Sequence, residues 1–151
     1  MLMSFSDATS RLETHRVENQ PRERGDEDLF GNDPALTALL ENLQVENRAQ
    51  LKAYAVKLGT KDAKHTARDA NRHAPELVLF DRGGRRLDEV RYHPSYHRFM
   101  DISQASGYAA VAWEGRSDGQ QTHAAMVYLA SQVEPGHCCP LTMTYAAIPM
   151  L

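Results

Sequence analysis

The stretch NDPALTALLENLQVENRAQLKAYAVKLG, residues 32–59, predicts two helices in succession. Asn32 or Asp33 can accept hydrogen bonds from the free N–H groups at the start of the first helix. Pro34 suits its first turn, because proline has no N–H to leave unpaired. Leucines at i, i+3, i+4 and i+7 then predict one buried stripe, made of Leu36, Leu39, Leu40 and Leu43.

The second of these helices should turn Leu51, Ala55 and Leu58 inward and end at Gly59. Thr60 opens a third helical stretch, residues 60–74. This stretch is polar on all sides, so we expect it to lie exposed or to be covered by something outside this chain.

The segment PELVLFDRGGRRLDEVRYHP, residues 75–94, breaks the helical pattern. LVLF is rich in strand-forming residues and DRGGR is typical of a turn, so the sequence predicts a β-hairpin that pairs 77–80 with 87–92. We expect one face of this hairpin to be buried and its basic tip to be exposed to solvent. The buried set is Leu77, Leu79, Leu87 and Val90, and the tip set is Arg82, Arg85 and Arg86.

The rest of the chain is also mainly helical. Pro94 opens a helix over 94–107, residues 108–115 favour helix over strand, and residues 122–136 form an amphipathic helix. The buried residues expected in the last of these are Ala125, Val127, Tyr128, Leu129 and Val133. A final helix over 138–149 has Pro140 in its first turn. The predicted fold is mainly α, with about six helices and one β-hairpin, preceded by a flexible N-terminal arm over residues 1–13.

Composition narrows the class of protein. The chain has 151 residues, 25% of them charged and 42% hydrophobic, which is ordinary for one globular domain. A formal net charge of −3 argues against strong binding of nucleic acid by this chain. Two adjacent cysteines cannot build a disulfide framework, no apolar run reaches membrane-spanning length, and the start has no signal-peptide pattern. These features predict a cytoplasmic protein that contacts no membrane.

The candidate sites for metal or covalent chemistry are weak. In HPSYH, His93 and His97 share a helical face, but surface or capping roles are commoner for such a pair. His137, Cys138 and Cys139 offer nitrogen and sulfur ligands without a second ligand pair, so we expect no metal site. A helix N-terminus can lower the pKa of a thiol, so a reactive cysteine at Cys138 or Cys139 stays an alternative. DRGGRR lacks the spacing of a phosphate loop, and no Ser–His–acid set stands out from spacing.

Several segments in order resemble a known family. They are THRVENQP, LFGNDPAL, ANRHAPELVLFDRGGRRLDEVRYHPSYHRFM, AWEG and QVEPGHCCPLTMTYAAIPML. Together they are similar to the N-terminal part of the AidB-like branch of the acyl-CoA dehydrogenase flavoproteins, from Thr14 to Leu151. Two stretches depart from the family pattern: RERGDED stands where an apolar, proline-rich stretch is usual, and GQQTHAAMVYL differs at its polar positions.

The resemblance implies an N-terminal helical domain over residues 14–151. A β-rich middle domain and a C-terminal helical domain would complete the fold, with FAD between those two. This chain would then supply no catalytic and no cofactor-binding residue. The uncharged segment after His137 would be a helix whose apolar face meets the missing domains. Its residues Met143, Thr144 and Tyr145 either line the substrate pocket or pack in the core.

The resemblance also implies a function for the whole protein. That function is FAD-dependent oxidation of acyl-CoA thioesters, linked to the response to alkylation damage. The whole protein would be a homo-oligomer, with a tetramer expected, and DNA would be contacted only through the absent C-terminal region. This chain would shape the substrate pocket and subunit contacts without catalysing alone. The alternative is a stand-alone helical protein-interaction module derived from the same domain.

Overall fold

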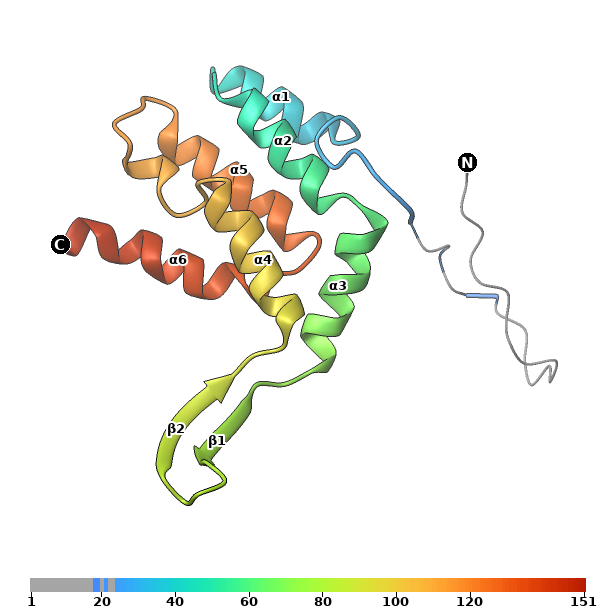
Figure 1. Cartoon of the computed structure of the whole chain (residues 1–151). Coiled ribbons are helices and arrows are strands. Elements are labelled where there is room, and N and C mark those ends of the chain that lie inside the picture. Colours follow the sequence, from blue (N-terminus) through green and yellow to red (C-terminus); the bar gives the residue numbers. More distant parts are fainter. Residues whose placement is uncertain (1–17, 20, 22–23) are drawn as a thin grey trace.

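The computed structural model describes residues 18, 19, 21 and 24–151, so the predicted arm over 1–13 lies outside the described residues. The elements follow the predicted order (Figure 1). They are α1 (Pro34–Asn42), α2 (Arg48–Leu58), α3 (Lys61–Arg72), β1 (Glu76–Phe80), β2 (Arg86–Arg91), α4 (Pro94–Ala105), the 3₁₀-helix η1 (Val111–Trp113), α5 (Gly119–Ser131), α6 (Cys138–Ala147) and the 3₁₀-helix η2 (Ile148–Met150). The mainly α fold with one hairpin is confirmed over this range. Residues 108–115 form turns around η1 and not the helix that the sequence favoured.

Local capping explains where the helices begin. The Asp33 side chain accepts a hydrogen bond from the Leu36 backbone N–H at 2.8 Å, and Pro34 occupies the first turn of α1 as predicted. Thr60 caps α3 in the same way, by accepting from the backbone N–H of Ala63 at 3.0 Å. Such caps satisfy N–H groups that the helix itself leaves without acceptors.

The start of α2 is capped from a distant part of the chain. No side chain of its own first turn caps it. Instead the buried Asp118 carboxylate, just before α5, accepts from the backbone N–H groups of Glu46 and Asn47, each at 2.9 Å. Asp118 also pairs with Arg116 at 3.1 Å. Burial acts to raise the pKa of Asp118, but these partners outweigh it and hold the pKa below its usual range.

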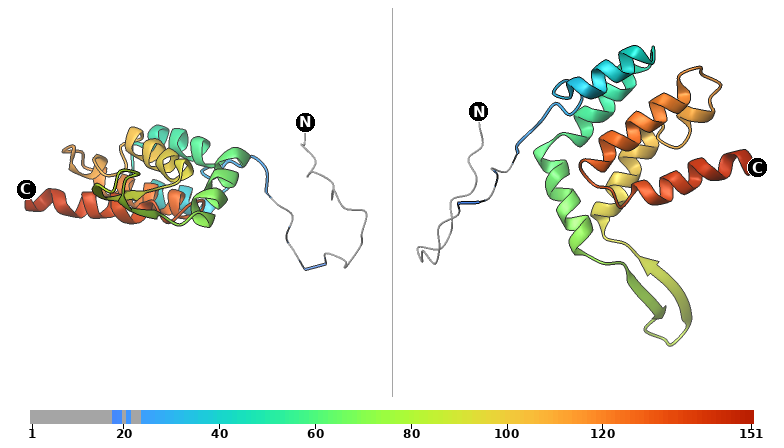
Figure 2. Two further views of the ribbon diagram at one scale, coloured as in Figure 1. Left: turned by 60° about the horizontal axis from the view of Figure 1, so that its bottom comes forward. Right: turned by 180° about the vertical axis from the view of Figure 1, so that it is seen from behind.

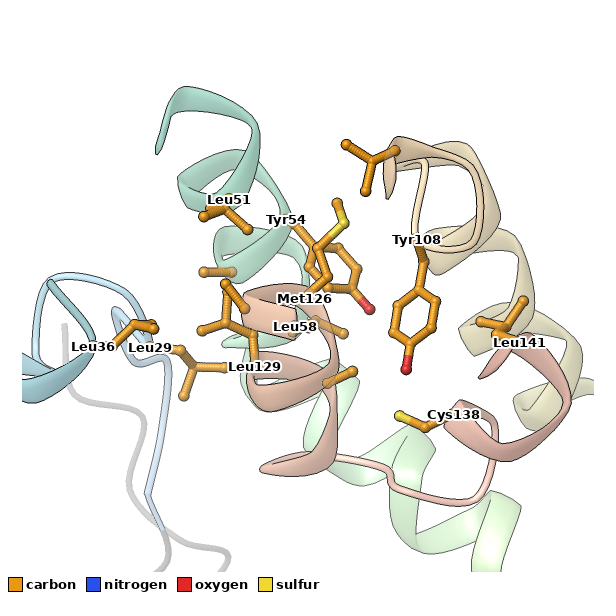
Figure 3. Close-up of a cluster of buried hydrophobic side chains, with 14 of the residues drawn as sticks. Leu29, Leu36, Leu51, Tyr54, Leu58, Tyr108, Met126, Leu129, Cys138 and Leu141 are labelled. Carbon is orange, nitrogen blue, oxygen red and sulfur yellow. The ribbon is translucent and has the colours of Figure 1, made fainter. Parts of the chain in front are cut away.

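The hydrophobic core lies between α2, α4, α5 and the start of α6 (Figure 3). Leu51, Ala55 and Leu58 of α2 are fully buried, which confirms the predicted inward face of this helix. The other large buried side chains include Tyr54, Phe99, Tyr108, Val111, Met126, Leu129 and Leu141. Burial of apolar surface of this kind stabilises the fold by roughly 25 cal/mol per Å².

Helix α3 is not exposed on all sides. It packs against α4, and its residues Ala63, Thr66 and Ala67 are buried. These residues are small and one of them is polar, so they do not stand out as an apolar stripe, yet they let the two helices approach closely. The Asp62 carboxylate accepts a hydrogen bond from the guanidinium of Arg98 across the same contact.

Two predicted apolar faces are only partly buried. In α1, Leu36 and Leu40 are buried, but Leu39 is 54% exposed and Leu43 is 46% exposed, so the predicted four-leucine stripe is wrong at two positions. The set predicted for a helix over 122–136 splits in the same way, and α5 itself ends at Ser131, before Val133. Ala125 and Leu129 are buried, Val127 and Val133 are half-buried, and Tyr128 is exposed. Helix α1 lies at the edge of the domain, whereas α5 lies within it and packs against α2, η1 and α6 (Figure 1).

The hairpin projects away from the helical body as a two-stranded ribbon (Figures 1 and 2). The pairing is antiparallel, with Leu77 opposite Val90 and Phe80 opposite Arg86, and it has one irregularity between Val78 and Phe80. The expected burial of one face is wrong within the described residues. Leu77, Leu79, Leu87 and Val90 are all 43–61% exposed, because the ribbon points away from the helices that could cover it.

No helix in the described residues is both long and apolar enough to cross a membrane.

Candidate functional site

Helix α6 carries the predicted site residues and is held to the domain along one side. Cys138 and Leu141 are buried, whereas Met143 is 68% exposed and Thr144 is exposed. No residue from Cys138 to Leu151 is charged. The outer face of α6 is therefore a neutral surface of methyl, thioether and hydroxyl groups. Met143 and Thr144 do not pack in the core of this domain.

Tyr145 faces a different direction. Residues two apart in a helix lie about 200° apart around its axis, so Met143 and Tyr145 point to different sides. The Tyr145 ring stacks on His123, with the centroids 3.9 Å apart, and lies 5.3 Å from the Trp113 ring. Its hydroxyl donates to Gln120 Oε1 at 2.6 Å. The structure thus joins Tyr145 to α5 and η1 and does not bring it together with Met143.

A chain of buried polar groups positions the start of α6. His137 Nδ1 lies 2.9 Å from Glu134 Oε2, and His137 Nε2 lies 2.8 Å from Ser103 Oγ. Ser103 Oγ in turn lies 2.6 Å from the Tyr54 hydroxyl. The remaining Glu134 oxygen accepts from Asn71 Nδ2 at 3.2 Å. Because these residues come from α2, α3, α4 and the loop before α6, the chain of hydrogen bonds ties four segments together.

The carboxylate of Glu134 is the charged end of this network. It also accepts from the backbone N–H groups of Gly136 at 2.9 Å and His137 at 2.8 Å. Burial acts to raise the pKa of Glu134, but the hydrogen bonds from the His137 side chain and from these two N–H groups outweigh it and bring the pKa to about 2. At the other end, burial raises the pKa of Tyr54 well above its ordinary value.

Ser103, His137 and Glu134 are hydrogen-bonded in the order of a hydrolytic triad, but their role is structural and not catalytic. Ser103 and His137 are fully buried and Glu134 is 2% exposed, so no substrate reaches the serine. The hydroxyl of Ser103 is already shared with Tyr54. A nucleophile needs an open side on which a reacting atom can sit. Spacing along the chain does not reveal this set, because Ser103 lies in α4 and the Glu134–His137 pair lies in the loop before α6.

The predicted metal-ligand candidates have other roles. Both ring nitrogens of His137 are engaged in the buried network. His93 caps α4 by accepting a hydrogen bond from the Ser95 backbone N–H at 3.2 Å, and its ring stacks on the ring of His73. The ring of His97 lies edge-on to the ring of Tyr92. The part of the chain that the structure describes holds no group of three or more His, Cys, Asp or Glu residues placed to bind an ion.

The alternative of a lowered thiol pKa, which the sequence left open for both cysteines, is wrong for Cys138. Its side chain is buried, and burial raises its pKa. Cys139, the next residue, is exposed.

A groove between α1 and α5 was not expected from the sequence. It has a volume of about 490 Å³ and is lined mainly by leucine, alanine, glutamine and tyrosine side chains. Leu39 and Leu43, which the stripe prediction buried, line it, and Tyr128 donates a hydrogen bond to Asp33 Oδ2 at 2.6 Å at its rim.

Comparison with known proteins identifies the family. The family model described as the adaptive response protein AidB N-terminal domain matches residues 19–151. The chain belongs to the AidB N-terminal domain family. This match includes α6 and the buried network before it, so the expected resemblance is confirmed over nearly all of the described residues.

One relative supports this assignment, and one solved structure shares the fold. The Escherichia coli (strain K12) protein named "Putative acyl-CoA dehydrogenase AidB" is 38% identical over 142 residues, which cover 92% of this chain and 26% of that protein. The crystal structure of Caenorhabditis elegans ACDH-11 in complex with C11-CoA has the same fold, with a TM-score of 0.69 and 23% identity over 90% of this chain and 24% of that one. The AidB-type chain thus spans about a quarter of the length of each of these relatives.

Proposed function

We propose that residues 14–151 are the N-terminal helical domain of a longer AidB-like acyl-CoA dehydrogenase flavoprotein. In this proposal the domain forms one wall of the acyl pocket with α6 and contributes to contacts between subunits, but does not catalyse alone. The observation that carries the proposal is the uncharged, exposed outer face of α6 in a chain of this family. Such a face suits an acyl chain, which is apolar and needs no charged partner.

The residues of this chain have limited roles in the proposed reaction. In the whole protein, bound FAD would supply the hydride-accepting chemistry for oxidation of an acyl thioester, and the proton-accepting carboxylate would come from outside this chain. Met143 and Thr144 fit a wall against the acyl chain or the flat flavin ring, because both are exposed and neutral. Tyr145 supports that wall from behind through its stack on His123. The buried Glu134–His137 pair sets where the wall begins.

The wider setting is part of the same proposal. We place the protein in the cytoplasm, as a homo-oligomer that takes part in the response to alkylation damage. The net charge of −3 supports assigning any contact with DNA to a C-terminal region and not to this domain. The match to only a quarter of each relative supports the middle and C-terminal domains as partners of α6.

The decisive experiment is to sequence the gene beyond the codon for Leu151 and to express the complete product of that reading frame. We expect bound FAD in that product, and a colourless 151-residue chain that does not quench free flavin. In the complete product, Met143→Trp should slow flavin reduction by long acyl-CoA thioesters more than by short ones. The reason is that a larger side chain on this wall occupies pocket space that a long acyl chain needs. Leu43→Trp, an equal enlargement on α1, is the control.

Two results would contradict the proposal. If Met143→Trp and Leu43→Trp had the same effect at every chain length, α6 would not form the acyl wall. If the reading frame stopped at Leu151, the chain would be a stand-alone interaction module instead.

A further inference from the structure

The hairpin has one apolar face and one face that mixes charged and apolar side chains. Residues alternate between the two sides of a strand, so Leu77 and Leu79 of β1 share a side, and Val90 joins them because it lies opposite Leu77. The irregular register then returns Leu87 of β2 to the same side. The opposite face carries Glu76, Val78, Phe80, Arg86, Glu89 and Arg91, and Asp88 lies at the irregularity with a φ of 51°.

The two edges of the hairpin are protected very differently. The β2 edge carries Arg86, Asp88, Glu89 and Arg91, and these form ion pairs along the strand. Charges of this kind discourage pairing with another strand. The β1 edge carries no charge from Leu77 to Phe80, and β1 pairs with β2 alone in the described part of the chain. A bare apolar edge strand is a template for adding a strand.

The sequence of β1 is symmetric about its centre. Glu-Leu-Val-Leu-Phe reads Leu-Val-Leu in either direction around Val78. An antiparallel pair of β1 strands related by a two-fold axis through Val78 would place Leu77 opposite the partner's Leu79, and Val78 opposite the partner's Val78. Glu76 would then lie opposite the partner's Phe80, so no like charges would meet.

The β2 edge fails the same test. A two-fold pairing in full register would place Arg86 opposite the partner's Arg91, and Asp88 opposite the partner's Glu89. Like charges directly opposite each other destabilise a strand pair. Charge thus allows self-pairing at one edge and opposes it at the other.

We propose that two copies of this chain associate through their β1 strands and form a four-stranded antiparallel sheet in the order β2-β1-β1-β2. The axis stands normal to the sheet, so both apolar faces lie on one side and Leu77 packs against the partner's Leu79. The proposal does not depend on the proposed function, because it uses only the hairpin. It also removes a weakness of the monomer, since an isolated two-stranded ribbon is marginally stable in water whereas a sheet of three or more strands is not.

The axis position gives a sharp test at Val78. Val78→Lys and Val78→Glu each place two like charges opposite one another, so each variant alone should sediment as a monomer at concentrations where the wild-type chain is dimeric, with Kd raised about tenfold or more. Mixing the two variants in equal amounts should restore the dimer, because each pair then joins opposite charges. Val78→Thr, which keeps the β-branched shape, should stay dimeric. Circular dichroism melts confirm that each variant is folded.

Two further measurements separate edge pairing from other association. Val90→Lys places one charge on the apolar face of β2, away from the axis, and should leave the dimer intact. In a Cys139→Ser background, Val78→Cys should form an intermolecular disulfide on mild oxidation, whereas Leu87→Cys should not. A wild-type chain that stays monomeric, a dimer that survives both charged Val78 variants, or mixing that restores nothing would each overturn the proposal.

Discussion

Replacing Glu134 tests the buried network most directly. Its side chain is 3% exposed and accepts hydrogen bonds from two backbone N–H groups and two side chains. Glu134→Ala leaves several buried donors without an acceptor, at about 1–3 kcal/mol for each. Some donors find new partners as the site relaxes. We therefore expect the free energy of unfolding at pH 7 to fall by about 3–5 kcal/mol, as for other broken buried pairs.

The isosteric change Glu134→Gln isolates the contribution of the charge. The folded-state pKa of Glu134 is about 2 and the reference value is 4.5. Each pKa unit corresponds to about 1.4 kcal/mol, so the ionised carboxylate stabilises the folded chain by about 3 kcal/mol at neutral pH. Because the folded pKa is depressed, this stability is fully present above pH 4.5 and is lost as the pH falls from 4.5 towards 2.

The assay is urea unfolding followed by circular dichroism at several pH values from 7 to 2.5. The difference between the wild-type chain and Glu134→Gln should be largest at pH 7 and shrink steadily below pH 4.5. Glu114→Gln changes the same charge at an exposed position and should stay within about 0.5 kcal/mol of the wild-type chain throughout. An equal difference between Glu134→Gln and the wild-type chain at pH 7 and pH 3 would refute the assigned role of the carboxylate.

Three further predictions test burial, capping and thiol access. In denaturant melts of the monomer, Leu51→Ala should cost about 2–5 kcal/mol, whereas Leu79→Ala should cost less than about 1 kcal/mol because its side chain is 45% exposed; equal losses would contradict the hairpin's position. Asp118→Ala should lower the free energy of unfolding by about 2 kcal/mol, because it removes the cap of α2, and an unchanged melt would argue against that cap. A thiol reagent should label Cys139 in the native chain and reach Cys138 only on unfolding, as mass spectrometry of the labelled peptide can show; rapid labelling of both would contradict the burial of Cys138.

Sequence reasoning succeeded where the interactions are local. The start of α1 at Pro34, the start of α4 at Pro94 and the pairing of 77–80 with the following strand all came from residues close together in the chain. Caps join a side chain to an N–H two or three residues on, and a hairpin is closed by a short turn, so their signals lie within a few positions. The family resemblance rests on the same ordered local segments, and it placed the α6 candidates on an exposed helix without showing that Tyr145 turns away from Met143.

Only the tertiary structure decided which side chains are covered. The leucine spacing of α1 predicts an apolar stripe, but whether Leu39 is buried depends on how many helices pack against α1. The hairpin has the alternation of a half-buried sheet, yet its direction away from the helices leaves the apolar face exposed. Likewise, Tyr54, Ser103 and His137 meet because three separate segments pack together, and no spacing along the chain encodes that contact. Periodicity specifies the two sides of an element, whereas contacts between residues far apart in sequence determine what each side meets.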